Sequence, residues 1–303
     1  MPINGIDAVY FGVEDIEKAT QFFVDFGLEK VQESATQTSL ETRDGGTVEI
    51  RAVDDASLPK AVTSGPTIRE IVWGVEDEEA LETIAAELSR DRAVERDADN
   101  GVHTTDDGGF GIAFRVARRR PASPAPNMLN IYGATPNRPM NVPVDFEKPI
   151  RPAAFAHVVI MTTDAEHAIK FYTERLGFRI TDKFREGRGA FLRAPNSTYH
   201  HTMFIVQGPA SGLHHVAFHV TDFNEIVMAG TRMLEKGWAP EMGPGRHIIG
   251  SNYFWYFKSP CGGAMELTAD MDRADDDWQM REWTMSPRTG AAWITQFQPM
   301  PGG

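Results

Sequence analysis

The chain has 303 residues, of which 41% are hydrophobic and 24% are charged, and this composition suits two ordinary domains better than one large core. The net charge of −13 argues against a general nucleic-acid-binding protein, because affinity for phosphate backbones depends largely on cationic side chains. The single cysteine, Cys261, excludes an internal disulfide and a thiolate metal cluster, and residues 1–18 contain neither a signal-peptide pattern nor a long apolar span. We therefore expect a cytoplasmic protein without a nucleic-acid or membrane partner.

An internal repeat appears when the chain is read from its beginning. Residues 6–31 show an apolar strand, an acidic helix start at Asp15 and an amphipathic helix that closes on glycine. Residues 156–181 repeat this pattern, with Asp164 at the helix start. The repeat predicts that the two halves of the chain share one fold.

A second pair of segments, residues 67–77 and 212–222, supports the repeat, since each alternates like a strand and then turns into an acidic helix start. Each half is therefore predicted to be a doubled βαβββ unit. Residues 136–152 are proline-rich without periodicity, as in a linker. The predicted division is an N-terminal domain over 1–135, a linker over 136–152, a C-terminal domain over 153–285 and a tail over 286–303.

Two histidines and one glutamate of the second half, His157, His215 and Glu266, lie in short apolar runs typical of strands. Two neutral imidazoles and one carboxylate are the ligand set of a non-haem iron(II) oxygenase, which leaves open metal positions opposite the ligands. The alternatives are histidines hydrogen-bonded within a core and a glutamate on an exposed strand. If Glu266 is buried, a metal would offset the cost of an isolated carboxylate.

The matching positions of the first half are predicted to be Asp7, Glu70 and Ala113, so no histidine remains there. We expect a working metal site in the C-terminal half alone and a structural role for the N-terminal half. A cation held by Asp7 and Glu70 is the alternative.

The most specific motif is residues 245–266, GRHIIGSNYFWYFKSPCGGAME, with His247, Tyr256, a Pro-x-Gly turn and Glu266 in order. With the strands around His157, His201 and His215, it resembles the signature of type I extradiol ring-cleaving dioxygenases of the vicinal oxygen chelate superfamily, which also contains glyoxalases and bleomycin resistance proteins. The resemblance covers residues 1–283. Trp255 and Ser259 depart from the usual pattern, and they concern packing and the turn rather than the metal.

The resemblance implies an α+β fold of two tandem vicinal-oxygen-chelate domains, each an open mixed-sheet barrel of two βαβββ modules. It implies that His157, His215 and Glu266 bind Fe(II), with Mn(II) as the alternative. The implied reaction is extradiol cleavage of a small aromatic diol by O2, giving a muconic semialdehyde-type product in aromatic degradation. Monocyclic catechols, including homoprotocatechuate-type ones, are favoured over biphenyl diols, and a homo-oligomer is expected.

Three further residues receive roles from the same resemblance. His201 is the acid/base residue, His247 binds a substrate oxygen, and Tyr256 lies near the substrate hydroxyl, although a tyrosine in such an aromatic run is also typical of a core.

Three histidines beside these are not given catalytic roles. Neighbours on a regular strand face opposite sides, so His200 is expected to point away from the pocket and His214 to be a structural or rim residue. His219 is expected to be a pocket wall or a solvated residue.

Two rival functions use the same fold. A glyoxalase-like or epimerase-like metalloenzyme usually needs a fourth protein ligand, and a metal-free protein that sequesters small molecules would not need the histidines. The tail is expected to be disordered, to cover the pocket mouth with Trp293 and Phe297, or to make subunit contacts.

Overall fold

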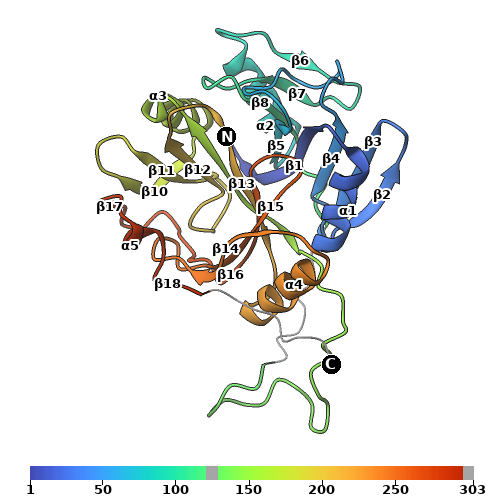
Figure 1. The fold of residues 1–303 in the computed structure, drawn as a ribbon. Coiled ribbons are helices and arrows are strands. Elements are labelled where there is room, and N and C mark those ends of the chain that lie inside the picture. Colours follow the sequence, from blue (N-terminus) through green and yellow to red (C-terminus); the bar gives the residue numbers. More distant parts are fainter. Residues whose placement is uncertain (121–128, 296–303) are drawn as a thin grey trace.

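The computed structural model describes residues 1–120 and 129–295, and within them the chain folds into two β-sheets with helices packed around them (Figure 1). The first half contains β1 (Ile3–Val13), α1 (Ile16–Phe26), β2 (Glu29–Glu33), β3 (Gln37–Glu41) and β4 (Thr47–Ala52). It continues with β5 (Thr67–Val75), α2 (Glu78–Leu88), β6 (Glu95–Arg96), β7 (Val102–Thr105) and β8 (Gly111–Val116).

The second half repeats this order. It contains β9 (Ala154–Thr162), α3 (Ala165–Lys170) with its π-helical continuation η1 (Phe171–Arg175), β10 (Arg179–Phe184), β11 (Gly189–Arg193) and β12 (Met203–Gln207). It continues with β13 (Gly212–His219), α4 (Phe223–Glu235), β14 (Pro240–Arg246), β15 (Tyr253–Lys258) and β16 (Ala264–Ala269). Three short elements follow: β17 (Arg281–Trp283), α5 (Pro287–Gly290) and β18 (Trp293–Ile294).

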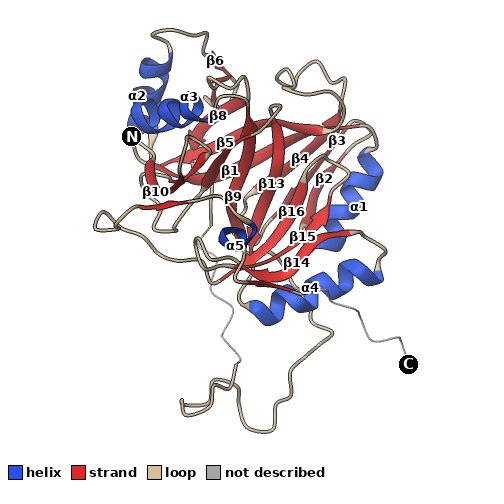
Figure 2. Ribbon diagram, turned by 60° about the vertical axis from the view of Figure 1, so that its left-hand side comes forward, coloured by secondary structure: helices blue, strands red, loops and turns tan. Residues whose placement is uncertain are grey.

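Both halves are therefore doubled βαβββ units, and the predicted α+β fold is confirmed. The first sheet has the order β2-β3-β4-β1-β5-β8-β7-β6, and the second has β17-β10-β11-β12-β9-β13-β16-β15-β14-β18. Each sheet mixes parallel and antiparallel pairs and stays open, because its edge strands do not pair with each other in the described residues (Figure 2). The predicted helix starts are confirmed, since the carboxylates of Asp15 and Asp164 accept hydrogen bonds from the first turns of α1 and α3.

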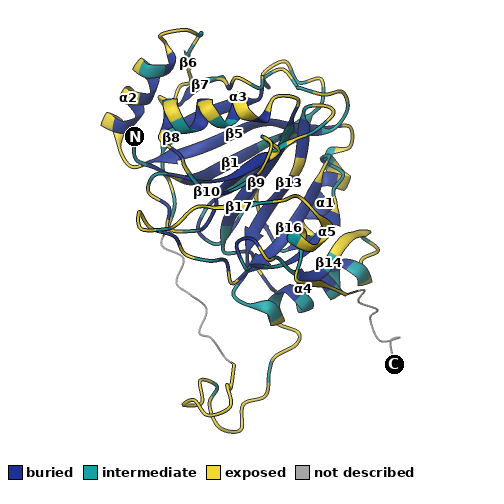
Figure 3. Cartoon of the chain, turned by 90° about the vertical axis from the view of Figure 1, so that its left-hand side faces the viewer, coloured by how far each residue is buried: buried dark blue, intermediate teal, exposed yellow. Residues whose placement is uncertain are grey.

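The two halves share one buried apolar core. Phe23 and Phe26 of α1 pack on Phe218 of β13, with ring centroids 6.3 Å and 5.3 Å away. Trp73 of the first half packs on Phe178 of the second half, with ring centroids 5.0 Å apart. Figure 3 shows that the central strands are buried along most of their length while the helices expose their outer faces.

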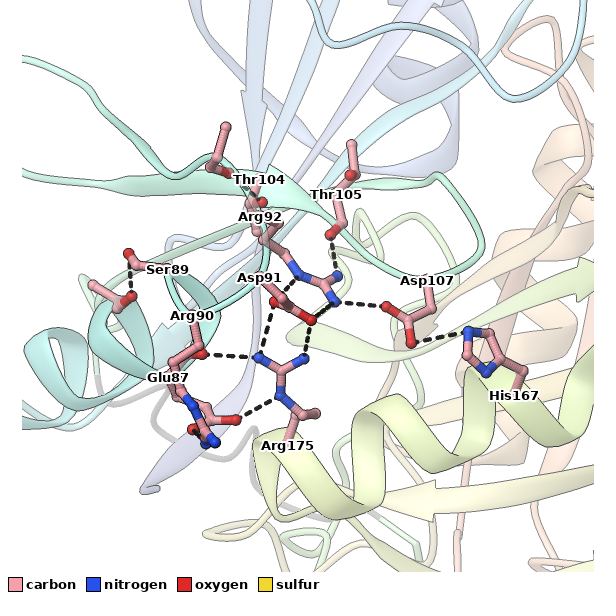
Figure 4. A network of polar contacts seen from close by, with 12 residues as sticks. Glu87, Ser89, Arg90, Asp91, Arg92, Thr104, Thr105, Asp107, His167 and Arg175 are labelled. Atoms are coloured by element: carbon pink, nitrogen blue, oxygen red, sulfur yellow. Dashed lines mark hydrogen bonds and ion pairs between the residues drawn. The ribbon is translucent and has the colours of Figure 1, made fainter.

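Charged side chains join the halves at the edge of this core (Figure 4). Arg175 of η1 donates to Glu87 and Asp91 at the end of α2, and His167 of α3 lies 3.1 Å from Asp107. The N-terminal half is thus packed against the C-terminal half through both apolar and ionic contacts.

The stretch expected to be a linker contains no helix or strand and projects from the body of the protein (Figure 1). The predicted tail begins with ordered structure, because α5 and β18 follow Met285 and β18 pairs with β14. Trp293 lies in β18, and Phe297 lies outside the described residues. No described helix is long and apolar enough to cross a membrane.

Candidate metal centre and its cavity

Three neighbouring strands of the second sheet carry the predicted ligands: His157 on β9, His215 on β13 and Glu266 on β16. Ala217 of the central strand pairs with His157 on one side and with Glu266 on the other. His215 is two residues before Ala217 and so shares its face of the sheet. The small side chain of Ala217 leaves the space between the three ligands open.

The ligand atoms form a nearly regular triangle. His157 Nε2, His215 Nε2 and Glu266 Oε2 are each 3.1 Å from the other two, and all three side chains are buried. Two ligands at right angles on a metal, each bonded at about 2.1 Å, are about 3.0 Å apart. The side chains therefore fit one face of an octahedral divalent metal, and His157, His215 and Glu266 are the group that could hold one in the described chain.

The electrostatics of the triad also suit a cation. Burial alone would raise the pKa of Glu266, but the neighbouring His157 and His215 hold it well below its usual value. Burial lowers the pKa of His215 to about 3, so its ring is neutral and offers a lone pair. A buried carboxylate beside two imidazoles is a donor set for a divalent metal.

Asn252, which the sequence did not single out, supports the carboxylate. This fully buried side chain donates to Glu266 Oε1 at 3.3 Å and to Thr268 Oγ1 at 2.8 Å. It fixes the orientation of the glutamate, as partners of metal ligands commonly do.

Of the two expectations for His214, the structure supports the position at the rim of the pocket, since this exposed residue lines the cavity. The pairing of β13 with β9 shifts between Leu213 and His215, so the strand is irregular at His214 and side-chain alternation fails there. His214 instead lies at the cavity, with its Nδ1 2.7 Å from Nδ1 of His215. His200 does not line the cavity but lies behind His201, and their Nδ1 atoms are 3.0 Å apart.

The first half differs from the prediction by one residue. Ala8, not Asp7, matches His157, because Ala8 pairs with Val72 as His157 pairs with Ala217. A shift in strand pairing between Ile6 and Ala8 hides this from a simple alignment. Ala8, Val72 and Ala113 form a small buried apolar cluster where the second half has its ligands.

The alternative, a cation held by Asp7 and Glu70, is not supported by the structure. Asp7 accepts a hydrogen bond from Arg115, and Glu70 pairs with His103 at 2.9 Å. Both carboxylates are therefore engaged by cations or donors of the protein itself.

A cavity of about 400 Å³ opens in front of the triad. His201, from the loop between β11 and β12, lines it next to the ligands, with its ring centroid 4.4 Å from that of His157. Since Nδ1 of His201 is bonded to His200, Nε2 is the ring nitrogen left for the cavity. Burial, reinforced by the neighbouring His157 and His200, holds the pKa of His201 well below its usual value.

His247 and Tyr256 line the cavity together. The carbonyl of Gly290 can only accept, so His247 Nδ1 donates to it at 2.6 Å. Burial lowers the pKa of His247, and the neutral ring then accepts at Nε2 from the Tyr256 hydroxyl at 3.0 Å. In this series of hydrogen bonds the Tyr256 hydroxyl is a donor, so the lone pairs of its oxygen remain as acceptors. Burial and the nearby Glu266 raise the pKa of Tyr256 well above its usual value.

Of the alternatives given for the tail, a cover over the pocket agrees with the lining of the cavity, although Trp293 is not among the lining residues. Met285, Ser286, Thr289 and Gly290, around α5, line the cavity, and no sequence periodicity signals this. His219, expected to be a pocket wall or solvated, is neither: it is buried away from the cavity, with its ring 4.3 Å from Tyr199.

Comparison with known proteins agrees with this geometry. Metapyrocatechase 2 of Cupriavidus necator is 37% identical over 123 residues, which are 41% of this chain and 38% of the relative. The iron-dependent extradiol dioxygenase of Rhodococcus jostii is 29% identical over 156 residues, 47% of this chain and 52% of the relative. The chain thus spans about half or less of the length of these two relatives.

A solved structure extends the likeness in fold to the whole chain. The Mn(II)-bound glyoxalase of Novosphingobium aromaticivorans superposes with a TM-score of 0.74 at 23% identity, covering 99% of this chain and 97% of the other. Residues 154–267, which contain all three ligands, match the family model of the Glyoxalase/Bleomycin resistance protein/Dioxygenase superfamily. The part of the chain that carries the candidate metal centre is therefore similar to members of this superfamily.

Proposed function

We propose that the protein is an extradiol dioxygenase that opens the ring of a catechol with O2 at a mononuclear Fe(II), with Mn(II) as the alternative metal. The observation that carries the proposal is the triangle of His157, His215 and Glu266 facing a cavity that also contains His201, His247 and Tyr256. The named relatives, an iron-dependent extradiol dioxygenase among them, support the same chemistry.

The three ligands would hold the metal at the side of the cavity that His157 and His215 line. When bound, the metal supplies a site that brings both catechol oxygens and dioxygen together. Three protein ligands on one face leave the other positions for these reactants.

The surrounding side chains would handle the protons. Because Tyr256 donates to His247, its oxygen can accept a hydrogen bond from a catechol hydroxyl and orient the ring. His201 Nε2 lies beside the metal ligands, where it can take up a proton from the substrate and return it when the ring opens.

The test is turnover by protein loaded with Fe(II) under argon. A panel of catechols is offered with oxygen, and oxygen uptake and the yellow absorbance of a semialdehyde are recorded. Uptake with at least one catechol is expected, and uptake with none would overturn the proposal. His215→Ala should lose both metal and turnover, whereas His167→Gln, on the exposed side of α3, should keep both.

A glyoxalase-like or epimerase-like enzyme is the rival, since a glyoxalase shares the fold. Such enzymes usually need a fourth protein ligand, but Ala8 and Ala113 offer none and Glu70 is bound to His103 in the other sheet. The presence of three ligands without a fourth, and the largely apolar cavity in front of them, favour the dioxygenase. Absence of bound or restorable iron would instead favour a metal-free sequestering protein.

We also propose that the protein forms a homo-oligomer. Apolar side chains of the projecting stretch, including Ile131, Tyr132, Met140 and Phe146, are exposed in the single chain and would be covered by a second copy. Light scattering on a gel-filtration column should give a multiple of the 33.7 kDa chain mass, and the chain mass itself would contradict the proposal. Cytoplasmic residence stays a prediction from the sequence.

A further inference from the structure

We propose that the substrate is a catechol with one uncharged, apolar ring substituent and that catechols carrying a carboxylate are excluded. The inference rests on the proposed function and adds the substrate class. It also narrows the sequence-based preference, which included homoprotocatechuate-type catechols. It is carried by the side of the cavity that leads away from the metal ligands.

That side of the cavity is an apolar strip made of Val159, Met161, Phe204 and Val206. On β9, every second residue from His157 faces the cavity, so Val159 and then Met161 follow the ligand along the strand. At about 3.3 Å per residue, Met161 begins about 13 Å from His157. The apolar strip therefore starts at the metal centre and extends beyond the length of a single ring.

The neighbouring strand β12 widens the strip. Phe204 pairs with Val159 and Val206 pairs with Met161, so the four side chains form two adjacent rows. Phe191 stacks on Phe204, with ring centroids 4.1 Å apart and planes 6° from parallel, which gives the wall a fixed aromatic surface. A ring substituent that points away from the metal along this strip contacts hydrocarbon side chains over its whole length.

The polar side chains along this wall are already engaged. The amide of Gln207 accepts from the Ala165 backbone at 2.9 Å and donates to the Thr163 carbonyl at 2.7 Å. Ser286 and Thr289 bond to each other in the capping box of α5. A polar substituent would therefore find few groups ready to replace its lost water.

Charge makes the selection stronger than polarity alone. Among the described residues that line the cavity there is no lysine or arginine. The chain as a whole is also anionic, with a net charge of −13. A carboxylate on the ring substituent would lose its hydration along the strip without gaining a cationic side chain, which is strongly unfavourable.

The size of the cavity limits the substituent. Its volume of about 400 Å³ is near the lower end of ligand pockets, which span roughly 300–1,000 Å³. This volume must hold the ring, the dioxygen and the substituent, so a short alkyl group fits better than a second fused ring system.

The test uses two matched pairs of catechols that differ in charge: 4-ethylcatechol with 3,4-dihydroxyphenylacetate, and 3-ethylcatechol with 2,3-dihydroxyphenylacetate. In the Fe(II)-loaded protein, kcat/KM should be at least ~100-fold higher for the ethyl member, since even one methylene in an apolar pocket discriminates by ~10–200-fold. Comparable values within both pairs would overturn the inference while leaving the dioxygenase function intact.

Binding separates this inference from the proposed function. Titration calorimetry on the Mn(II)-loaded protein under argon measures the same preference without turnover. If no catechol is cleaved but the ethyl catechols bind at least ~10-fold more tightly, the function fails and the substrate preference stands. Equal binding within both pairs overturns the preference whatever the turnover.

A substitution in the strip provides a second measurement. Val206 is partly exposed to the cavity, and Val206→Lys would place a cation beside the substituent. The ethyl-to-carboxymethyl ratio of kcat/KM should fall at least ~10-fold in Val206→Lys and stay near the wild-type ratio in the uncharged control Val206→Met. An unchanged ratio in a folded Val206→Lys protein would contradict the assignment of the strip, and the wild-type pairs decide the case if that variant does not fold.

Discussion

Removing the amide that holds the glutamate ligand should weaken metal binding without removing a ligand. In Asn252→Ala, Glu266 loses its hydrogen bond from Nδ2. A hydrogen bond to a charged group contributes about 1.5–3 kcal/mol, but the observed 3.3 Å is longer than the usual charge-assisted bond of about 2.7–2.9 Å. The lower end, about 1.5 kcal/mol, corresponds to a loss of about tenfold in affinity, within the range for partners of metal ligands.

The assay is calorimetric titration of metal-free protein with Mn(II) under argon, which needs no turnover. Ser251→Ala is the matched control, because the neighbouring Ser251 side chain bonds Asp272 and not the ligand. Asn252→Ala should bind Mn(II) about tenfold more weakly and Ser251→Ala as tightly as wild type. If folded Asn252→Ala kept the wild-type affinity, the orienting role of Asn252 would be refuted.

The remaining predictions concern a proton carrier, a turn and a partly buried ion pair. His201→Gln should lower kcat for catechol cleavage at least ~100-fold, the low end of general acid–base catalysis, while iron content stays at the wild-type level; loss of iron would contradict the role. Gly262→Ala should lower the free energy of unfolding in urea by more than about 2 kcal/mol, because its Cβ would lie 2.2 Å from a backbone oxygen of the first half at a φ of +79°. Gly237→Ala, at a φ of +84° with open space around it, should lose only about 1 kcal/mol, and equal losses would argue against the steric clash. The hydrogen bond that His103 donates to Glu70 raises the pKa of His103 to about 9 from 6.5, so this stabilisation is full below pH 6.5 and lost as the pH rises through about 9. The stability difference between wild type and His103→Gln should therefore shrink from about pH 6 to about pH 10, and a difference independent of pH would speak against the pairing.

The ligand set could be predicted because its signal is local. His157, His215 and Glu266 each lie in an apolar run that predicts a buried strand. Burying a polar side chain in such a run is unfavourable unless the side chain has a partner, and a metal is one such partner. The repeat then predicted that these strands occupy equivalent places in their modules. Adjacent strands in one sheet bring the three side chains together.

What the sequence did not predict depends on strand pairing. The position of His214 could not be read from alternation, because the irregular pairing of β13 is set by its neighbour β9. The same reason explains the error of one residue at Asp7, since pairing with β5, and not spacing along β1, determines which residue matches His157. Register of this kind is a property of two strands and is absent from either one alone.

Other parts of the site depend on contacts between distant segments. Gly290 binds His247 through its backbone carbonyl, and a backbone group carries no signal in the residue type. Asn252 lies next to an aromatic run that reads as core, and its role becomes visible only once β16 places Glu266 beside it.

The most direct test of the central claim is the stoichiometry of oxygen consumption in protein loaded with Fe(II). With limiting 4-ethylcatechol, an oxygen electrode and mass analysis of the product should show one O2 consumed per ring-opened product, and His215→Ala should show neither uptake nor product. Ring opening without O2 consumption, or O2 consumption with an intact ring, would contradict the assignment of His157, His215 and Glu266 as the metal centre of an extradiol dioxygenase.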